Sequence, residues 1–143
     1  MKKQVSIGVL VIISVLILFS CKKNSPSSPA AYLAGTWKIY KGYLDTNKND
    51  YRDINEIFTD TAFITQYFKF KPDGTYTISY YSTLTQGTWK FIYNNTYLKI
   101  TNDTGAPVKY FFVENLTESN MELKDTTGVA SGGFTEWFFY AKE

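Results

Sequence analysis

The segment Tyr67–Lys90 constrains the fold more than any other, because apolar or aromatic residues occupy every second position in much of it. Phe68 and Phe70 alternate with lysines before the Pro72–Gly74 turn, and three more such residues alternate with Thr and Ser after it. A period of two on both sides of an Asp-Gly pair is typical of two half-buried strands joined by a tight hairpin. Gly74 supplies the positive φ that such a turn needs.

The rest of the chain repeats this pattern of short aromatic strands separated by polar turns. Eight such strands favour an all-β fold, an antiparallel up-and-down barrel that is closed or nearly closed. The longest polar connection, Asp45–Asp60, contains one candidate helical turn at Asp53–Phe58, and Ser82–Gln86 is a polar break between two strands. The predicted strands are Leu33–Leu44, Ala62–Lys71, Thr75–Ser82, Thr88–Tyr93, Thr96–Thr101, Val108–Asn115, Asn120–Lys124 and Phe134–Lys142.

Composition excludes several kinds of active site. The 143 residues include no histidine and one cysteine. The absence of histidine removes the usual general base, the common nucleophile pairs and the commonest zinc ligand. Glu114, Glu118 and Glu122 recur every fourth residue, but a strand–turn–strand pattern predicts that they lie scattered and solvated. We find no nucleophile elbow and no phosphate-binding glycine-rich loop, so we expect no enzymatic activity.

The N-terminus has the features of a secretion signal. A nearly unbroken apolar run of 15 residues, Val5–Phe19, is short for a membrane-spanning helix and suits a signal core. The run ends in Leu18-Phe19-Ser20-Cys21, which resembles the lipobox of bacterial lipoproteins. The resemblance implies that residues 1–20 are a signal peptide and that Cys21 carries the lipid. The alternatives are cleavage without lipidation and an uncleaved anchor.

The segment Lys22–Ala31 is predicted to be a tether. Serine and proline dominate it, and no apolar period is present. Residues 21–31 would then link the lipid to a domain formed by residues 32–143. Several acyl chains on Cys21 would hold the protein durably to a membrane, which is its first expected partner. We therefore expect a bacterial cell-envelope protein, on the outer membrane and facing the periplasm.

The charge balance gives no reason to expect nucleic acid as a partner. The formal net charge is +2, but Lys2 and Lys3 lie in the predicted signal peptide. Without these two, 13 basic residues remain against 13 acidic ones. The mature chain is thus predicted to be neutral, which is unlike the basic surface of nucleic-acid-binding proteins.

Several short motifs follow one another in a fixed order along residues 32–143. They are Gly35-Thr36-Trp37, the hairpin Phe68–Tyr76, Gly87-Thr88-Trp89, Leu98-Lys99-Ile100 and the run Val113–Leu123. Their order and spacing resemble the lipocalin-like domains of small bacterial lipoproteins. The resemblance implies an eight-stranded up-and-down barrel of the calycin type, with room for an apolar cavity.

The inward faces of the strands are the first candidate binding site. An eight-stranded barrel is just wide enough either to be filled by side chains or to hold one small ligand. Bulky aromatic residues favour a filled interior. Buried tyrosine hydroxyls need polar partners, and the polar end of an apolar or amphipathic ligand could supply one. The candidate ligand-binding residues are Trp37, Phe68, Phe70, Tyr76, Ile78, Tyr80 and Trp89, with Phe91, Leu98 and Ile100 also predicted to point inward.

A second interpretation is an envelope interaction module without an interior ligand. The barrel would then be solid, and outward aromatic residues would dock a protein or a glycan. Tyr40, Tyr81 and Tyr140 are the candidates for this role.

The loop Asp45–Glu56 is the second candidate site. Its oxygen-bearing residues stand at the first, third, fifth, seventh, ninth and twelfth positions, which is the ligand spacing of a calcium loop of EF-hand type. One departure is Asp50, which stands at the sixth position where that pattern has glycine. The alternative is a solvated polar loop. The predicted ligands are Asp45, Asn47, Asn49, the Tyr51 carbonyl, Asp53 and Glu56.

Overall fold

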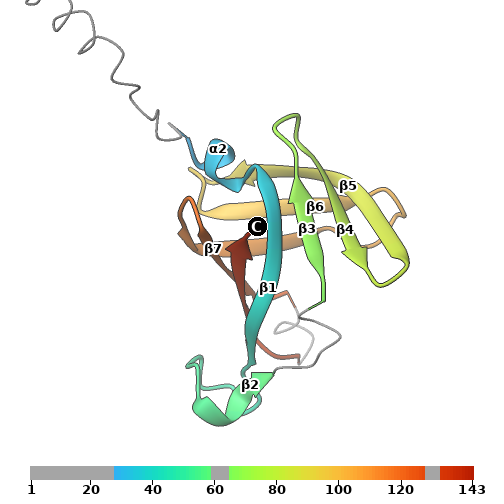
Figure 1. The fold of residues 1–143 in the computed structure, drawn as a ribbon. Helices are drawn as coiled ribbons and strands as arrows, with labels where there is room; N and C mark the ends of the chain where they lie inside the picture. Colours follow the sequence, from blue (N-terminus) through green and yellow to red (C-terminus); the bar gives the residue numbers. More distant parts are fainter. Residues whose placement is uncertain (1–27, 59–64, 128–132) are drawn as a thin grey trace, which may run out of the picture.

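The computed structural model describes residues 28–58, 65–127 and 133–143, which form one helix, one 3₁₀ turn and nine strands (Figure 1). None of the helices in these ranges has the length and hydropathy needed to cross a membrane. The elements are α2 (Pro29–Leu33), β1 (Gly35–Leu44), the 3₁₀ turn Ile54–Glu56, β2 (Ile57–Phe58), β3 (Tyr67–Phe70), β4 (Thr75–Tyr80), β5 (Thr83–Ile92), β6 (Tyr97–Asn102), β7 (Lys109–Leu116), β8 (Asn120–Asp125) and β9 (Glu136–Lys142).

The strands form a closed antiparallel barrel, as predicted. From β3 to β9 each strand pairs with its sequence neighbour, and β9 pairs with β1 along almost the whole of β1. The other edge of β1 is shared, since its first half pairs with β3 and its second half with the short strand β2. Eight strands therefore close the barrel, and β2 is a short additional strand that pairs with β1 beside it.

Several strand ends differ from the prediction by one or two residues, and the start of β5 differs by five. Leu33 lies in α2 rather than in the first strand, because Ser28 caps a helical turn that begins at Pro29. Strand β5 begins at Thr83, so the predicted polar break at Ser82–Gln86 is wrong. The turn between β4 and β5 lies instead at Tyr81, which has a φ of 50°. The first residues of the predicted strand Ala62–Lys71 lie outside the described ranges.

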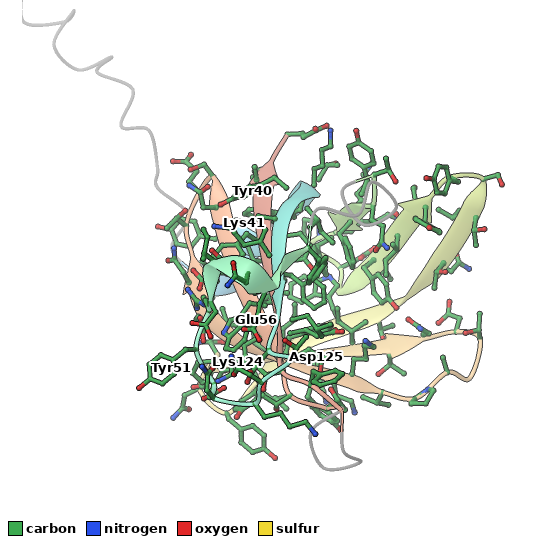
Figure 2. All side chains as sticks on the ribbon, turned by 90° about the horizontal axis from the view of Figure 1, so that it is seen from below. Tyr40, Lys41, Tyr51, Glu56, Lys124 and Asp125 are labelled. Carbon is green, nitrogen blue, oxygen red and sulfur yellow. The ribbon has the colours of Figure 1, made fainter. Side chains whose placement is uncertain are left out.

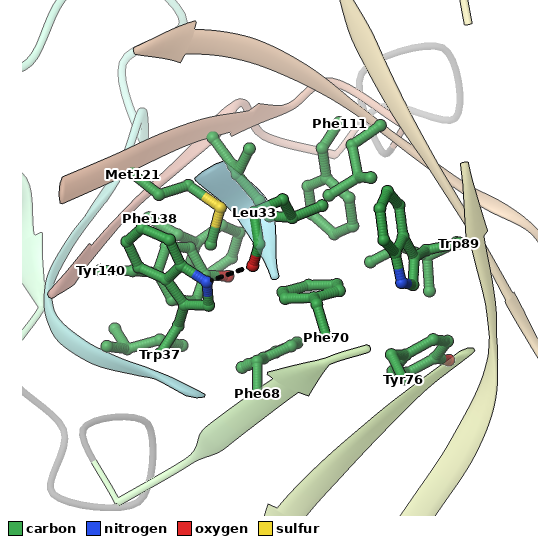
Figure 3. Close-up of a cluster of buried hydrophobic side chains, with 14 residues drawn as sticks. Leu33, Trp37, Phe68, Phe70, Tyr76, Trp89, Phe111, Met121, Phe138 and Tyr140 are labelled. Atoms are coloured by element: carbon green, nitrogen blue, oxygen red, sulfur yellow. Dashed lines mark hydrogen bonds between the residues drawn. The ribbon is translucent and has the colours of Figure 1, made fainter. Parts of the chain in front are cut away.

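Aromatic side chains fill the barrel at the end that α2 covers (Figure 3). Trp37 is fully buried, and its indole N–H donates to the Leu33 carbonyl at 2.7 Å. Leu33 is itself fully buried, so α2 closes this end of the barrel. The ammonium of Lys142 lies 5.1 Å from the centre of the Trp37 ring and donates to the Tyr32 carbonyl at 2.8 Å. These contacts join the first and last strands to the closing helix.

Candidate functional site

A cavity of about 380 Å³ occupies the other half of the barrel. This volume lies near the lower end of the range for small-molecule pockets, which is roughly 300–1,000 Å³. Glu136, one of its residues, pairs with Leu44 at the end of β1 that lies away from α2. The cavity therefore opens opposite the closed end. Its lining residues are Ile39, Gln66, Phe68, Ile78, Ile100, Asn102, Pro107, Lys109, Phe111, Glu136, Phe138 and Tyr140.

The cavity has an apolar wall and a few polar groups. Aliphatic and aromatic side chains from β1, β3, β4, β6, β7 and β9 form the wall. Lys109 and Glu136 supply charge, and the Lys109 ammonium lies 3.2 Å from a carboxylate oxygen of the buried Asp125. Burial raises the pKa of Glu136, the nearby Lys109 partly offsets that rise, and Asp125 adds to it. Few, convergent polar groups on an apolar wall are typical of sites for amphipathic small molecules.

Tyr140 is the phenol that lines the cavity. Only 2 % of the residue is exposed, so the prediction that Tyr140 points outward is wrong. Burial raises the pKa of its hydroxyl far above the ordinary value, and the charges of Asp125 and Glu136 add to the shift. The hydroxyl is therefore neutral at any physiological pH and able to donate a hydrogen bond. Tyr40 and Tyr81, the other residues predicted to be outward, are exposed.

Of the seven predicted ligand-binding residues, only two line the cavity. Phe68 and Ile78 line the cavity. Tyr76 is buried in the core and its hydroxyl bonds to the Asn102 side chain, which supplies the polar partner that a ligand was predicted to supply. Tyr80 is half-buried, and its ring centre lies 4.7 Å from that of Tyr81. The others, Trp37, Phe70 and Trp89, belong to the hydrophobic core.

The sequence reasoning missed the contributions of β7 and β9 to the cavity. On β9, Trp137, Phe138, Phe139 and Tyr140 form an unbroken aromatic run, so alternation could not tell one face from the other. Trp137 faces the outside of the barrel and is still only 2 % exposed, because the loop after β1 covers it. One sequence feature could have pointed to β9 as part of the cavity: Glu136, a single charged residue directly before the aromatic run.

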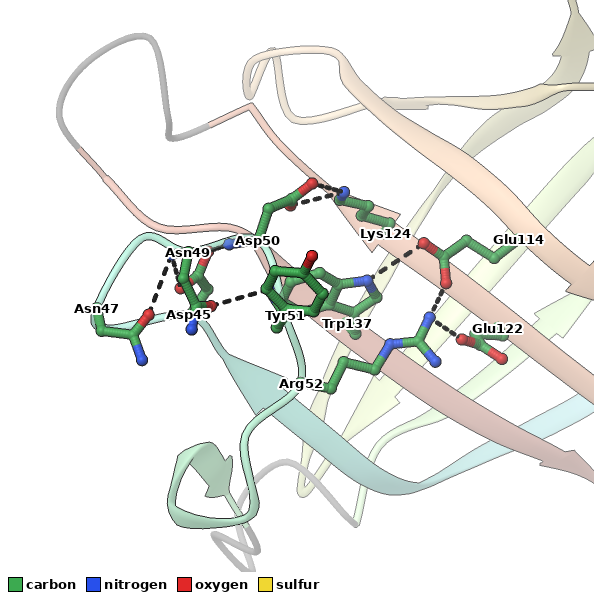
Figure 4. Close-up of polar contacts among 10 residues, drawn as sticks. All are labelled: Asp45, Asn47, Asn49, Asp50, Tyr51, Arg52, Glu114, Glu122, Lys124 and Trp137. Carbon is green, nitrogen blue, oxygen red and sulfur yellow. Dashed lines mark hydrogen bonds and ion pairs between the residues drawn. The ribbon is translucent and has the colours of Figure 1, made fainter.

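The loop Asp45–Glu56 packs against the outside of β7, β8 and β9 (Figure 4). Arg52 pairs with both Glu114 and Glu122, and its guanidinium lies 5.6 Å from the centre of the Trp137 ring. The prediction that the three glutamates lie scattered is therefore wrong for Glu114 and Glu122, whereas Glu118 is exposed in the turn between β7 and β8. The pairing of β7 with β8 shifts register between Val113 and Asn115, which leaves Glu114 as an extra residue beside Glu122, and the two carboxylates meet at one arginine. Viewed from below, Glu56 and Lys124 lie at this side of the molecule, and Tyr51 points outward (Figure 2).

The six predicted calcium ligands all lie in this loop, at different depths. Asp45 and Glu56 are buried, with 2 % and 8 % of each residue exposed. Asp53 accepts from the side-chain amides of Asn47 and Asn49 at 2.8 and 3.0 Å. These hydrogen bonds lower the pKa of Asp53. The side chain of Tyr51 is exposed, but only its carbonyl was predicted as a ligand.

Comparison with known proteins supports the fold. Neither a family model nor a curated protein sequence matches the chain. The solved structure of a DUF4847 family protein from Bacteroides vulgatus matches with a TM-score of 0.53 and 17 % identity, over 78 % of this chain and 94 % of that chain. A lipocalin-like protein from Bacteroides uniformis matches with a TM-score of 0.53 and 15 % identity, over 78 % of this chain and 99 % of that chain. At these identities the similarity establishes the fold alone, and the fold is that of a lipocalin-like barrel.

Proposed function

We propose that this protein is a lipid-anchored protein of the cell envelope whose barrel binds one small apolar or amphipathic molecule. The observation that carries the proposal is the cavity of about 380 Å³ with an apolar wall and a few polar groups. Binding would be passive. Each methylene group of a ligand that leaves water contributes about 0.8 kcal/mol. The Tyr140 hydroxyl, with Asn102 and Lys109 at the wall, would orient the polar end of the ligand.

Blocking the cavity is expected to weaken ligand binding strongly without unfolding the barrel. Leu33 is the first core residue, so residues 22–143 keep the whole described core. Octylamine, 1-octanol and octanoate would be titrated into this protein by calorimetry. Ile78→Trp should weaken binding at least about tenfold, since the added ring occupies the space that the ligand needs. The matched control is Leu84→Trp, because Leu84 is 63 % exposed and lies outside the cavity.

A second variant removes the polar anchor and preserves the volume. Tyr140→Phe is expected to weaken binding of the three amphiphiles by several-fold, which is the effect of losing one hydrogen bond of about 1 kcal/mol. Absence of heat with all three probes would contradict interior binding, and so would equal affinities of the wild-type protein and Ile78→Trp. Either result would favour the docking module, whose candidate surface includes the exposed Tyr40 and Tyr81.

Lipid attachment is a separate part of the proposal. It is supported by the lipobox-like sequence that ends at Cys21, a residue outside the described ranges. When the full chain is expressed in a Gram-negative host fed with labelled palmitate, the label is expected to enter the protein. Cys21→Ser should abolish the labelling, and Lys22→Ser is the control that should not. Labelling that persists in Cys21→Ser would contradict attachment at this cysteine.

A further inference from the structure

The carboxylate of Glu56 is only half satisfied in the fold. Its Oε1 accepts from the backbone N–H groups of Thr46 and Asn47 at 2.7 and 3.1 Å, and from the Thr46 hydroxyl at 2.8 Å. Its Oε2 is buried and has no hydrogen-bond partner. Among the described residues it is the only buried side-chain oxygen or nitrogen that lacks one. A buried carboxylate oxygen without a partner is costly and requires an explanation. A bound cation would supply the missing partner.

The loop folds over this carboxylate in a tight curl. The two carboxylate oxygens of the buried Asp45 accept from the backbone N–H groups of Asn49 and Asp50, at 3.0 and 2.9 Å. Asp50 has a φ of 60°, the left-handed conformation that glycine usually adopts. The aspartate that departs from the sequence pattern therefore makes the sharp turn for which a calcium loop uses glycine.

A third carboxylate bonds to the same half of the loop. Asp53 accepts from the amides of Asn47 and Asn49, the residues at the third and fifth positions. The amide oxygen of Asn47 accepts from the backbone N–H of Asn49, and that of Asn49 accepts from the backbone N–H of Tyr51. An amide oxygen has two lone pairs, so one remains available for a cation. Side chains from both ends of the loop thus converge on its first half.

Two further charged side chains of the loop pair with residues of the barrel strands, and the Lys48 ammonium lies 5.4 Å from the centre of the Phe134 ring. Asp50 pairs with Lys124 at 2.7 Å, and Arg52 pairs with glutamates of β7 and β8. Asp45, Asp53 and Glu56 instead accept hydrogen bonds from N–H groups of the loop itself. Within the described residues no three Asp, Glu, Cys or His side chains are placed to form a metal site alone. A site here needs amide and backbone oxygens as well, and such hard, mixed oxygen ligands suit calcium.

We propose that the Asp45–Glu56 loop binds one calcium ion through the side chains of Asp45, Asn47, Asn49, Asp53 and Glu56 and the Tyr51 carbonyl. Glu56 Oε2 and the Asp53 carboxylate would gain the cation as a partner after a small contraction of the loop. Three carboxylates are fewer than in high-affinity sites, which places the expected Kd at roughly 10⁻⁴–10⁻³ M, as in extracellular calcium modules. The bound ion would stabilise the loop that covers Trp137.

A calcium titration of the full chain in phosphatidylcholine nanodiscs tests this site, with empty nanodiscs as the blank. Calorimetry should give one calcium per chain. At about 10 mM calcium the Tm should rise by about 5 °C, whereas magnesium at the same concentration should have a smaller effect, because it requires shorter, octahedral coordination. Absence of both heat and a Tm shift would overturn the proposal, and so would an equal response to magnesium.

Two variants locate the ion within the molecule. Glu56→Gln removes the charge at the buried end and should weaken calcium binding at least tenfold. Asp53→Asn also removes a negative charge and should likewise weaken calcium binding. Asp53 is more exposed than Glu56, so the risk that this variant unfolds is small. Asp103→Asn is the matched control, because Asp103 is an exposed acid outside the loop, and its affinity should equal that of the wild-type protein. Unchanged calcium affinity in a folded Asp53→Asn variant would overturn the assignment.

Discussion

Replacing Trp37 with alanine is expected to lower the free energy of unfolding of residues 22–143 by about 3–5 kcal/mol. Trp37 is fully buried where α2, β1, β3 and β9 meet. Truncation therefore leaves a cavity, because the strands of a closed barrel cannot move inward to fill it. The variant also loses the hydrogen bond to the Leu33 carbonyl and the contact with the Lys142 ammonium. Urea unfolding followed by circular dichroism would measure the loss.

Two further variants separate packing from general sensitivity to substitution. Trp37→Phe keeps part of the ring volume and should lose less stability than Trp37→Ala. Tyr93→Ala removes an aromatic residue that is 75 % exposed and should change the free energy of unfolding by no more than about 0.5 kcal/mol. If Trp37→Ala were as mild as Tyr93→Ala, the packed end of the barrel would not be the source of its stability.

Replacing Gly87 with alanine is expected to cost about 3 kcal/mol, which is large for the addition of one methyl group. Gly87 lies on β5 opposite Asn102 of β6. A Cβ atom at Gly87 would overlap the Thr101 carbonyl oxygen and would lie 3.0 Å from the Cα atom of Asn102. Both obstacles are backbone atoms, so the clash can be relieved only by separating the two strands. Differential scanning calorimetry should show a strongly lowered Tm.

Gly105→Ala is the matched control for this substitution. Gly105 has a φ of 77°, but no atom lies within 4 Å of the added Cβ. The expected cost is therefore only the strain of a left-handed alanine, about 1 kcal/mol. Equal costs at the two positions would mean that β5 and β6 can move apart more easily than their close approach indicates.

Most of the fold could be predicted from alternation, because one face of most strands is apolar and the other polar. The hairpin at Gly74 and the strands on either side follow directly from that pattern. The start of β5 could not be predicted in this way. Leu84 and Tyr81 are exposed at the tip of the β4–β5 hairpin, where both faces meet solvent and the period of two is lost. Helix α2 was missed because five residues are too few to show a helical period.

The candidate sites were only partly predictable, for a different reason. A cavity depends on which inward side chains fail to meet across the barrel, and alternation alone cannot specify that. The sequence therefore could not distinguish Phe68 and Ile78, which both pack in the core and line the cavity, from Trp37 and Phe70, which lie in the core away from it. The spacing of Asp45 and Glu56 was visible along the chain, whereas the unpartnered oxygen of Glu56 appears only in the folded molecule.

The position of α2 has a consequence for how the proposed anchor would orient the molecule. Seven residues, Lys22–Ser28, separate Cys21 from the first residue of α2, and a chain of that length spans at most about 25 Å. A lipid on Cys21 would hold the sealed end of the barrel close to the bilayer, with the mouth of the cavity directed away from it. A ligand would then enter and leave on the aqueous side, so exchange with a soluble donor would be easier than direct extraction of a molecule from the membrane that holds the anchor.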